Sequence, residues 1–363
     1  MKIDQLKVTN FRNIRRLEYQ PISHSNIIIG KNGEGKTNLL EAIYMMSGNS
    51  SFRTNTDQDL INYDALYYII RAKYNCLEKD YNIILNYNLN VSKEMKLNNK
   101  KVALSNDELL KVVLFTPDDL YLVKGSPQKR RYFLDFILKQ LDAEYKLILD
   151  NYSKLLRKRN LLLKNDQTNS KNFTIVNDLF LENASKLILL RLNFITIYEE
   201  IAKEVFKEIN NNLNNLKIRY ALSFPVNSDK INLDILINSL AKQLQAKSTI
   251  EKRRRSTVAG PHLDDLHIYL DNRIARNFAS QGQQRNIAIT MKLAELYVFK
   301  KIMGFYPLFL LDEVLAELDN EKRQLLMDLL INADYQSFLT SVNIDKLNIG
   351  DAHLDSIVDG SLV

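Results

Sequence analysis

Residues 30–37 constrain the fold of this chain more than any other stretch. They read Gly-Lys-Asn-Gly-Glu-Gly-Lys-Thr, which matches the pattern of a glycine, four residues, and then glycine, lysine and serine or threonine. The preceding residues 26–29 are mostly isoleucine, as in a buried strand, and residues 38–46 repeat apolar side chains at helical spacing. A strand, a glycine loop and a helix in this order predict a phosphate-binding loop, because backbone N–H groups and the helix N-terminus converge on an anion.

The loop residues have expected roles in holding a nucleoside triphosphate. Lys36 would reach the β- and γ-phosphates and take part in catalysis, and Thr37 would hold Mg²⁺. Arg12, in the turn at residues 9–13, could reach a phosphate; a solvated turn arginine is the open alternative. For the loop itself the alternative is an ordinary glycine turn, and the matching strand and helix argue against it. The predicted nucleotide-binding residues of the loop are Gly30, Lys31, Asn32, Gly33, Glu34, Gly35, Lys36 and Thr37.

The composition limits which cellular compartment and which partners we expect. The chain has 363 residues, enough for two or three domains, and 50 Lys and Arg against 43 Asp and Glu give a net charge of +7. That balance is compatible with a polyanionic partner but is weak support alone. The single cysteine, Cys76, excludes an internal disulfide, and residues 1–8 alternate like a strand rather than a signal peptide. Since no apolar run approaches a membrane span, we expect a cytoplasmic protein with no membrane partner.

The order of elements predicts an interrupted α/β domain. Strand patterns at 2–8, 14–20, 65–73, 81–91, 94–104 and 112–115 precede a helical stretch, with a helix opening at Pro127 and helices at 143–164 and 175–211. Strand-like pieces at 215–235 lead to a strand at 266–270, a helix at 283–303, a strand at 306–311, a helix at 319–332 and a strand at 337–340. We therefore predict a head formed by residues 1–120 and 256–363, with an antiparallel, mainly helical lobe inserted at 121–255.

Two acidic residues, Asp312 and Glu313, directly follow the apolar strand that ends at residue 311. A phosphate-loop enzyme needs a carboxylate at a strand end to hold Mg²⁺, and Asp312 suits that role. Glu313 would orient and deprotonate the attacking water. The alternative is a strand end stopped by two solvated acids.

A third motif opens the helix at 283–303. Residues 280–285 read Ser-Gln-Gly-Gln-Gln-Arg, in which Ser280 can cap the helix and the glycine permits close backbone approach. Alone, this is a well-capped helix. Together with the other two motifs, it forms the second half of a composite ATP site.

These motifs resemble those of the ABC-type ATPases. In that superfamily the signature motif, here Ser280 to Gln284, closes on ATP held by a second copy, with Ser280, Gly282 and Gln283 as the expected contacts. Asp319 matches the aspartate that crosses between the copies. The segments 10–13, 124–135, 260–265 and 280–285 further resemble the RecF family, which is related to SMC proteins, over residues 2 to about 345. Two departures stand out: Leu263 replaces an arginine that is usual in the family, and no histidine lies near Thr340, where many ABC proteins sense the γ-phosphate.

The resemblance implies an ATP-dependent DNA-binding protein of recombinational repair and replication restart. It implies an ATP-dependent homodimer and weak Mg²⁺-dependent ATPase activity used as a switch. It also implies single- and double-stranded, gapped DNA as the substrate, with RecO and RecR as partners that help to load RecA. A transport-type ABC ATPase subunit and a non-enzymatic ATP-binding scaffold are the alternatives, in that order.

Basic residues of the helical lobe are candidates for DNA contacts. Lys154 and Lys158 share one helix face, and contacts to a DNA backbone would be independent of sequence and sensitive to salt. Solvated side chains are the alternative for each residue, and structural ion pairs are a further alternative for Arg130 and Arg131. The candidates are Lys129, Arg130, Arg131, Lys154, Arg157, Lys158, Arg159, Lys252, Arg253, Arg254 and Arg255.

Overall fold

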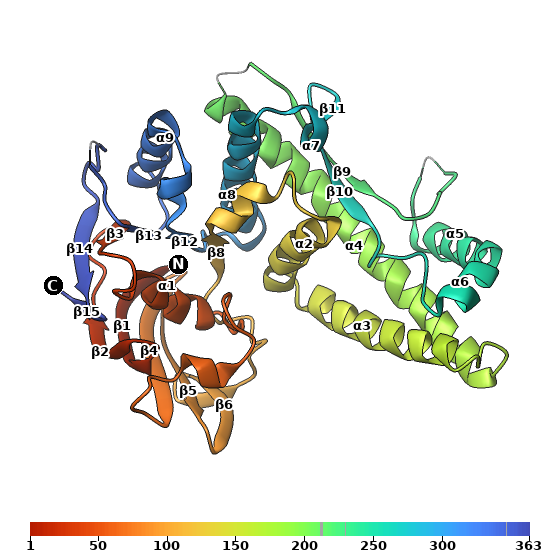
Figure 1. Cartoon of the computed structure of the whole chain (residues 1–363), viewed down its shortest axis with the longest axis horizontal. Helices are drawn as coiled ribbons and strands as arrows, with labels where there is room; N and C mark the ends of the chain where they lie inside the picture. The colour runs from red at the N-terminus through yellow and green to blue at the C-terminus, as the bar shows by residue number, and fades with distance from the viewer. Residues whose placement is uncertain (211–212, 229, 346) are drawn as a thin grey trace. The chain divides into compact units, whose positions relative to one another are not determined.

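The computed structural model describes residues 1–210, 213–228, 230–345 and 347–363, which divide into two compact units. The first unit contains residues 1–120 and 291–363, and the second contains residues 121–290 (Figure 1). The first boundary coincides with the predicted one. Residues 256–290 differ, since they are predicted in the head yet lie in the second unit. The physical reason is strand pairing: β10 (Asp265–Leu270) pairs antiparallel with β9 (Leu216–Ala221).

A mostly parallel sheet forms the core of the first unit. Its strand order is β15-β14-β3-β13-β12-β8, so the strand that leads into the glycine loop lies between two strands from the end of the chain (Figure 1). β3, β13, β12 and β8 are almost entirely buried, which explains the continuous apolar runs at 112–115 in β8 and 308–311 in β12, whereas β13 is buried although three of its five residues are serine or threonine. The bounds are β3 (Ser25–Ile29), β8 (Val112–Phe115), β12 (Leu308–Asp312), β13 (Ser337–Ser341), β14 (His353–Val358) and β15 (Ser361–Leu362).

An antiparallel sheet completes the first unit. Buried and accessible residues alternate along β4, where Tyr68, Ile70 and Tyr74 face the core while Arg71 and Lys73 are exposed. This alternation explains why its strands are recognisable in the sequence. The strand order is β2-β1-β4-β5-β6-β7. The bounds are β1 (Lys2–Phe11), β2 (Ile14–Tyr19), β4 (Tyr67–Cys76), β5 (Lys79–Asn88), β6 (Val91–Leu97) and β7 (Lys100–Val102).

Helices and short 3₁₀ segments connect the strands in the described part of the first unit. α1 (Lys36–Met45) follows the glycine loop, and α9 (Asn320–Ile331) follows β12. The division between the units falls inside α8 (Gln281–Met303), which begins two residues before the predicted helix. The 3₁₀ segments are Asp57–Leu60, Pro117–Tyr121 and Val314–Glu317.

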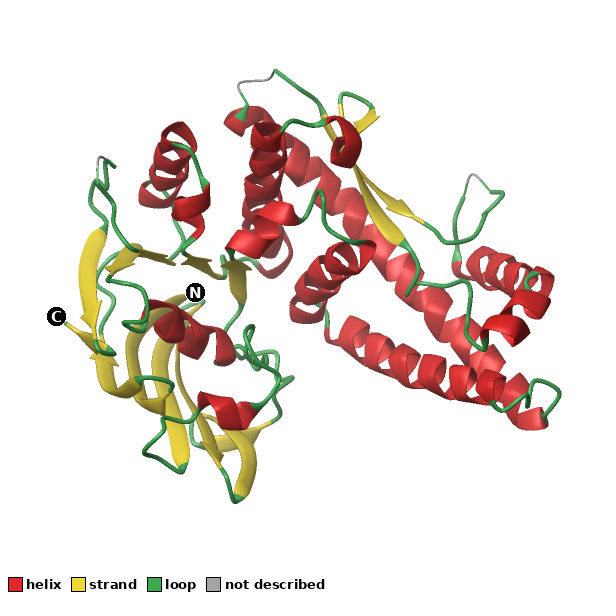
Figure 2. Cartoon of the chain, in the orientation of Figure 1, coloured by secondary structure: helices red, strands yellow, loops and turns green. Residues whose placement is uncertain are grey.

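The second unit is mainly helical (Figure 2). α3 packs along α4, and side chains cap four of the helices: Ser126, Asp142, Ser170 and Asn232 each accept a hydrogen bond from a backbone N–H of the first turn. The cap at Ser170 explains why α4 begins four residues before the predicted start. The bounds are α2 (Pro127–Leu141), α3 (Ala143–Lys164), α4 (Lys171–Ile209), α5 (Leu233–Ala246), α6 (Ser248–Arg254), α7 (Ala275–Phe278) and β11 (Arg273–Ile274).

A buried polar network fixes the segment 260–265 inside the second unit. Arg191 donates hydrogen bonds to Asp135 Oδ1 at 2.6 Å, Tyr220 OH at 2.8 Å and Pro261 O at 2.9 Å. Tyr220 OH in turn donates to Asp264 Oδ2 at 2.8 Å. Because each buried charge has charged or polar partners, the network can hold helix, sheet and segment together without an unpaired ion.

Of the helices that the structure describes, none is both long and apolar enough to cross a membrane.

Candidate nucleotide site and nucleic-acid interface

The glycine loop has the backbone that its sequence predicts. Gly33 and Gly35 adopt φ values of +89° and +113°, which side-chain-bearing residues rarely adopt. Gly30 is required for a different reason, since a Cβ atom there would lie 2.6 Å from Ile357 O. The loop can therefore turn its N–H groups toward an anion at the start of α1.

Lys36 lies across the loop that precedes it. Its side chain is 2% exposed, and Nζ donates to Gly30 O at 2.9 Å and to Lys31 O at 3.0 Å. Nζ also lies 3.0 Å from Glu313 Oε1, so the structure brings the two predicted catalytic groups together. An ammonium held by carbonyl oxygens and a partly exposed carboxylate is well placed to exchange them for phosphate oxygens.

Three oxygen-bearing side chains meet at the carboxyl ends of β12 and β13. Asp312 Oδ1 accepts hydrogen bonds from Thr37 Oγ1 at 2.8 Å and from Thr340 Oγ1 at 2.9 Å. Burial raises the pKa of the Asp312 carboxyl above its ordinary value, against the effect of the two hydroxyl donors. Thr340 also accepts from the N–H of Glu313 at 3.0 Å, where Glu313 adopts a left-handed φ of +52°.

The oxygens of Thr37 and Asp312 fit a Mg²⁺ ion. Among the described residues there is no group of three or more His, Cys, Asp or Glu that could hold a metal. Mg²⁺ does not need one, because it keeps several waters and is usually held by one or two carboxylates together with substrate phosphates.

Arg12 is placed by a partner that sequence reasoning missed. Its Nε and Nη2 donate to the two carboxylate oxygens of Glu41, each at 3.0 Å, and Glu41 is fully buried on α1. Ser51 also donates to Glu41, and Arg53 lies 3.6 Å from it. The sequence did contain a signal for this pair: Glu41 lies among apolar residues in the middle of α1, and a buried charge requires a partner. The pair holds Arg12 beside the middle of α1.

The signature motif forms a reciprocal cap within the second unit. Ser280 Oγ accepts from the N–H of Gln283 at 3.2 Å, and Gln283 Oε1 accepts from the N–H of Ser280 at 2.9 Å. In the first unit Asp319 caps α9, accepting from the N–H of Lys322 at 3.0 Å and from Lys322 Nζ at 2.9 Å. Both predicted contact motifs are thus helix starts whose caps are formed by their own side chains.

Two of the candidate DNA-contacting residues are buried. Arg130 makes a two-bond pair with Asp265, with both N···O distances 2.8 Å, and Arg159 pairs with Glu251 at 2.7 and 2.8 Å. Arg131 is half-buried and donates to Asp264 O. Arg130 and Arg159 are therefore excluded as DNA contacts, and for Arg130 the structural alternative holds.

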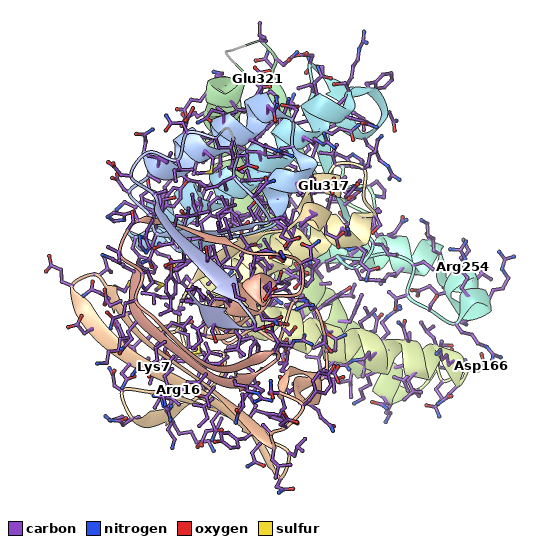
Figure 3. The ribbon with its side chains drawn as sticks, turned by 60° about the vertical axis from the view of Figure 1, so that its left-hand side comes forward. Lys7, Arg16, Asp166, Arg254, Glu317 and Glu321 are labelled. Atoms are coloured by element: carbon purple, nitrogen blue, oxygen red, sulfur yellow. The ribbon has the colours of Figure 1, made fainter. Side chains whose placement is uncertain are left out.

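The other candidates are exposed on the second unit. Arg254 lies at the end of α6 and Asp166 at the turn after α3 (Figure 3). Arg255 Nη2 is 3.8 Å from Asp166 Oδ2. Exposed cations therefore lie along α3 and at the end of α6, where water can reach them. The exposed candidates are Lys129, Lys154, Arg157, Lys158, Lys252, Arg253, Arg254 and Arg255.

Comparison with known proteins identifies the family. The RecF/RecN/SMC N-terminal domain model matches residues 2–358. The DNA replication and repair protein RecF of Bacillus cereus (strain G9842) is 36% identical over 378 residues, which cover 100% of this chain and 98% of that protein. RecF of Bacillus thuringiensis (strain Al Hakam) is 37% identical over 360 residues, which cover 96% and 93%.

Solved structures agree with the sequence match. The recombination mediator protein RecF-ATPrS in the RecFOR pathway superposes with a TM-score of 0.90 at 29% identity, over 99% of this chain and 97% of that chain. An SMC head bound to the C-winged helix domain of ScpA gives a TM-score of 0.57 at 15% identity, over 100% and 96%, and shares the fold alone. The predicted α/β ABC-type ATPase head is confirmed, and the chain belongs to the RecF family of the RecF/RecN/SMC group.

Proposed function

We propose that this chain is an ATP-dependent DNA-binding protein of recombinational repair and replication restart. The observation that carries the proposal is the convergence of Lys36 on Glu313 and of Thr37 on Asp312, because it brings the phosphate-binding lysine, the metal-holding oxygens and the catalytic carboxylate of a phosphate-loop ATPase into one site. Solved structures described as RecF with ATP support ATP as the nucleotide.

The second part of the proposal concerns the use of ATP. One copy binds the triphosphate through Gly30 to Thr37, and the Ser280–Gln283 cap of a second copy closes over the γ-phosphate, with Asp319 crossing between the copies. Mg²⁺ on Thr37 and Asp312 would neutralise charge on the β- and γ-phosphates. Glu313 orients and deprotonates water, and slow hydrolysis then releases the dimer.

The third part concerns DNA and protein partners. The exposed cations on α3 and α6 bind the phosphate backbone of gapped DNA, both single- and double-stranded, without reading its sequence. A relative's assignment to the RecFOR pathway supports joint action with RecO and RecR in loading RecA, in the cytoplasm. Membership of the RecF family favours this function over a transport-type ABC ATPase.

Sizing and DNA-retention measurements with and without ATP and Mg²⁺ test the proposal, using wild type, Lys36→Arg and Glu313→Gln. Wild type should dimerise and stay on DNA only with ATP, Lys36→Arg should lose hydrolysis, and Glu313→Gln should remain as an ATP-bound dimer on DNA. If neither the mass of the protein in solution nor its retention on DNA depends on ATP, the proposed switch is wrong. Phosphate release unchanged in Glu313→Gln would favour a non-enzymatic ATP-binding scaffold instead.

A further inference from the structure

We infer that the C-terminal turn, residues 358–361, is a positioning element that holds the phosphate-binding loop in its binding shape through Glu34. The inference rests on the proposed binding of ATP by that loop. It concerns a part of the chain beyond the recognisable motifs, and a loop residue at a position where the motif itself allows any amino acid.

Two backbone donors of the C-terminal turn bind one residue of the loop. The N–H of Asp359 donates to the Glu34 carboxylate, Oε2, at 2.5 Å, and the N–H of Gly360 donates to Glu34 O at 2.8 Å. The turn thus fixes both the side chain and the main chain of Glu34. A carboxylate engaged by an N–H of the turn is not a phosphate ligand, so Glu34 acts by position.

The shape of the turn depends on its own backbone conformation. Asp359 and Gly360 adopt φ values of +47° and +73°, and a Cβ atom at Gly360 would lie 2.8 Å from Asn13 O. β15 closes the turn by pairing with β14, and the N–H of Val363 donates to Ser356 O at 2.8 Å. The donors are therefore presented by a folded hairpin whose first strand is held in the parallel sheet beside β3.

Asn13 braces the loop as well. Its Nδ2 donates to Gly33 O at 3.1 Å, and its Oδ1 accepts from Asn38 Nδ2 at 2.7 Å. A Cβ atom at Gly35 would lie 2.8 Å from the same Oδ1, so loop and asparagine are in close contact. Because Gly360 packs on the backbone of Asn13, the turn supports the loop directly and also through this residue.

Bracing of this kind should increase the affinity of the loop for nucleotide. A loop that is already ordered spares the ordering cost at the moment of binding, so the braced protein binds more tightly than one whose loop must be ordered by the ligand. Loss of a hydrogen bond to a charged acceptor corresponds to a change of about tenfold or more in an equilibrium constant. We expect this loss mainly in affinity, since neither Glu34 nor the turn supplies a catalytic group.

The experiment compares wild type, Glu34→Ala, Glu34→Gln and a chain ending at Val358. Glu208→Ala, an exposed glutamate on α4, is the matched control. Titration with mant-ATP measures affinity, and hydrogen exchange of residues 30–34 in nucleotide-free protein measures loop order. Glu34→Ala and the shortened chain should bind mant-ATP about tenfold more weakly and exchange faster. Glu34→Gln keeps an oxygen acceptor for the Asp359 N–H but loses the charge, so its loss of affinity should be smaller than that of Glu34→Ala, whereas Glu208→Ala should stay near wild type.

Unchanged affinity and unchanged exchange in both Glu34→Ala and the shortened chain would overturn the inference. Equal losses in Glu34→Ala and Glu34→Gln would also overturn it, because the charge rather than the hydrogen bond would then be responsible. If wild type bound no mant-ATP, the proposed function would fail. The exchange measurement would still decide whether the turn orders the loop.

Discussion

Lys36 Nζ lies 3.0 Å from Glu313 Oε1, so the lysine expected to bind phosphate is paired with the carboxylate expected to activate water. Lys36 is almost fully buried, whereas about a third of the Glu313 side chain is exposed. The pair links the loop after β3 to the end of β12. Nucleotide must displace this contact before either group can act on phosphate or water.

Glu313→Gln should separate binding from hydrolysis. Without the competing carboxylate, Lys36 is freer to meet phosphate, and ATP affinity should rise modestly, by up to about fivefold. Hydrolysis should fall by about 10²-fold or more because the general base is lost. Equilibrium titration and single-turnover phosphate release measure the two effects. Weaker ATP binding in this variant would contradict the displacement argument.

Thr340 orients both Asp312 and Glu313. Its hydroxyl donates to Asp312 and accepts from the N–H of Glu313. Thr340→Val removes both bonds at almost constant volume, and kcat should fall about tenfold with a smaller change in KM. Thr340→Ser keeps the hydroxyl and should retain activity. A Val variant as active as wild type would show that the hydroxyl is dispensable.

Neighbouring residues 158 and 159 should have opposite mutant phenotypes. Arg159 is buried and paired with Glu251, so Arg159→Met should destabilise the protein by about 3–5 kcal/mol, because an unpaired carboxylate is left inside. Lys158 is exposed, so Lys158→Ala should leave unfolding almost unchanged while weakening DNA binding and reducing its salt dependence. Urea unfolding and salt-dependent DNA titrations distinguish them. A folded Arg159→Met protein with a DNA defect alone would contradict the assignment.

His262 should make the protein sensitive to acid. Burial lowers the pKa of its imidazole to about 4, while an unfolded histidine has its ordinary pKa of about 6.5. Between these values the unfolded chain binds a proton that the folded chain does not, so stability falls as pH falls through this window. The loss at its acid end is at most about 3 kcal/mol.

Urea unfolding from neutral pH down to about pH 4 measures this effect. His262→Asn cannot titrate there, so its stability should vary less with pH even though it loses the hydrogen bond between Tyr152 and His262 Nδ1. His24→Asn, at an exposed position, is the control and should follow wild type. Identical pH profiles for wild type and His262→Asn would refute the role of this imidazole.

The parts of the fold that sequence predicts are those whose signal is local. The loop at 30–37 is defined by adjacent residues, and α3 is defined by a cap and a regular apolar face. β14 gave no such signal, because Ile357 is its one fully buried residue and its partner β3 lies near the other end of the chain. β14 forms because it pairs with the edge of β3, and no local sequence pattern predicts that pairing.

The same distinction applies to the site. The residue types of Lys36, Asp312 and Glu313 predict their chemistry, and the structure brings them together. Arg130 and Arg159 have the sequence pattern of solvent-exposed cations, yet their carboxylate partners are far along the chain and bury them. Basic residues in a helical sequence therefore indicate a region of contact, and burial decides which of them can reach DNA.

The helix α5 could have been predicted from the sequence, since Asn232 caps it and Leu236, Leu240 and Leu244 repeat at helical spacing.

The placement of β3 between β13 and β14 has a consequence for biosynthesis. The strand that carries the phosphate loop emerges early from the ribosome, but both of its neighbours are made near the end of the chain. At about 5–20 residues per second, the roughly 300 intervening residues take about 15–60 s to translate. Throughout that time an apolar strand has two unpaired edges, so newly made chains are prone to aggregate until the strands on either side of the nucleotide loop have been made.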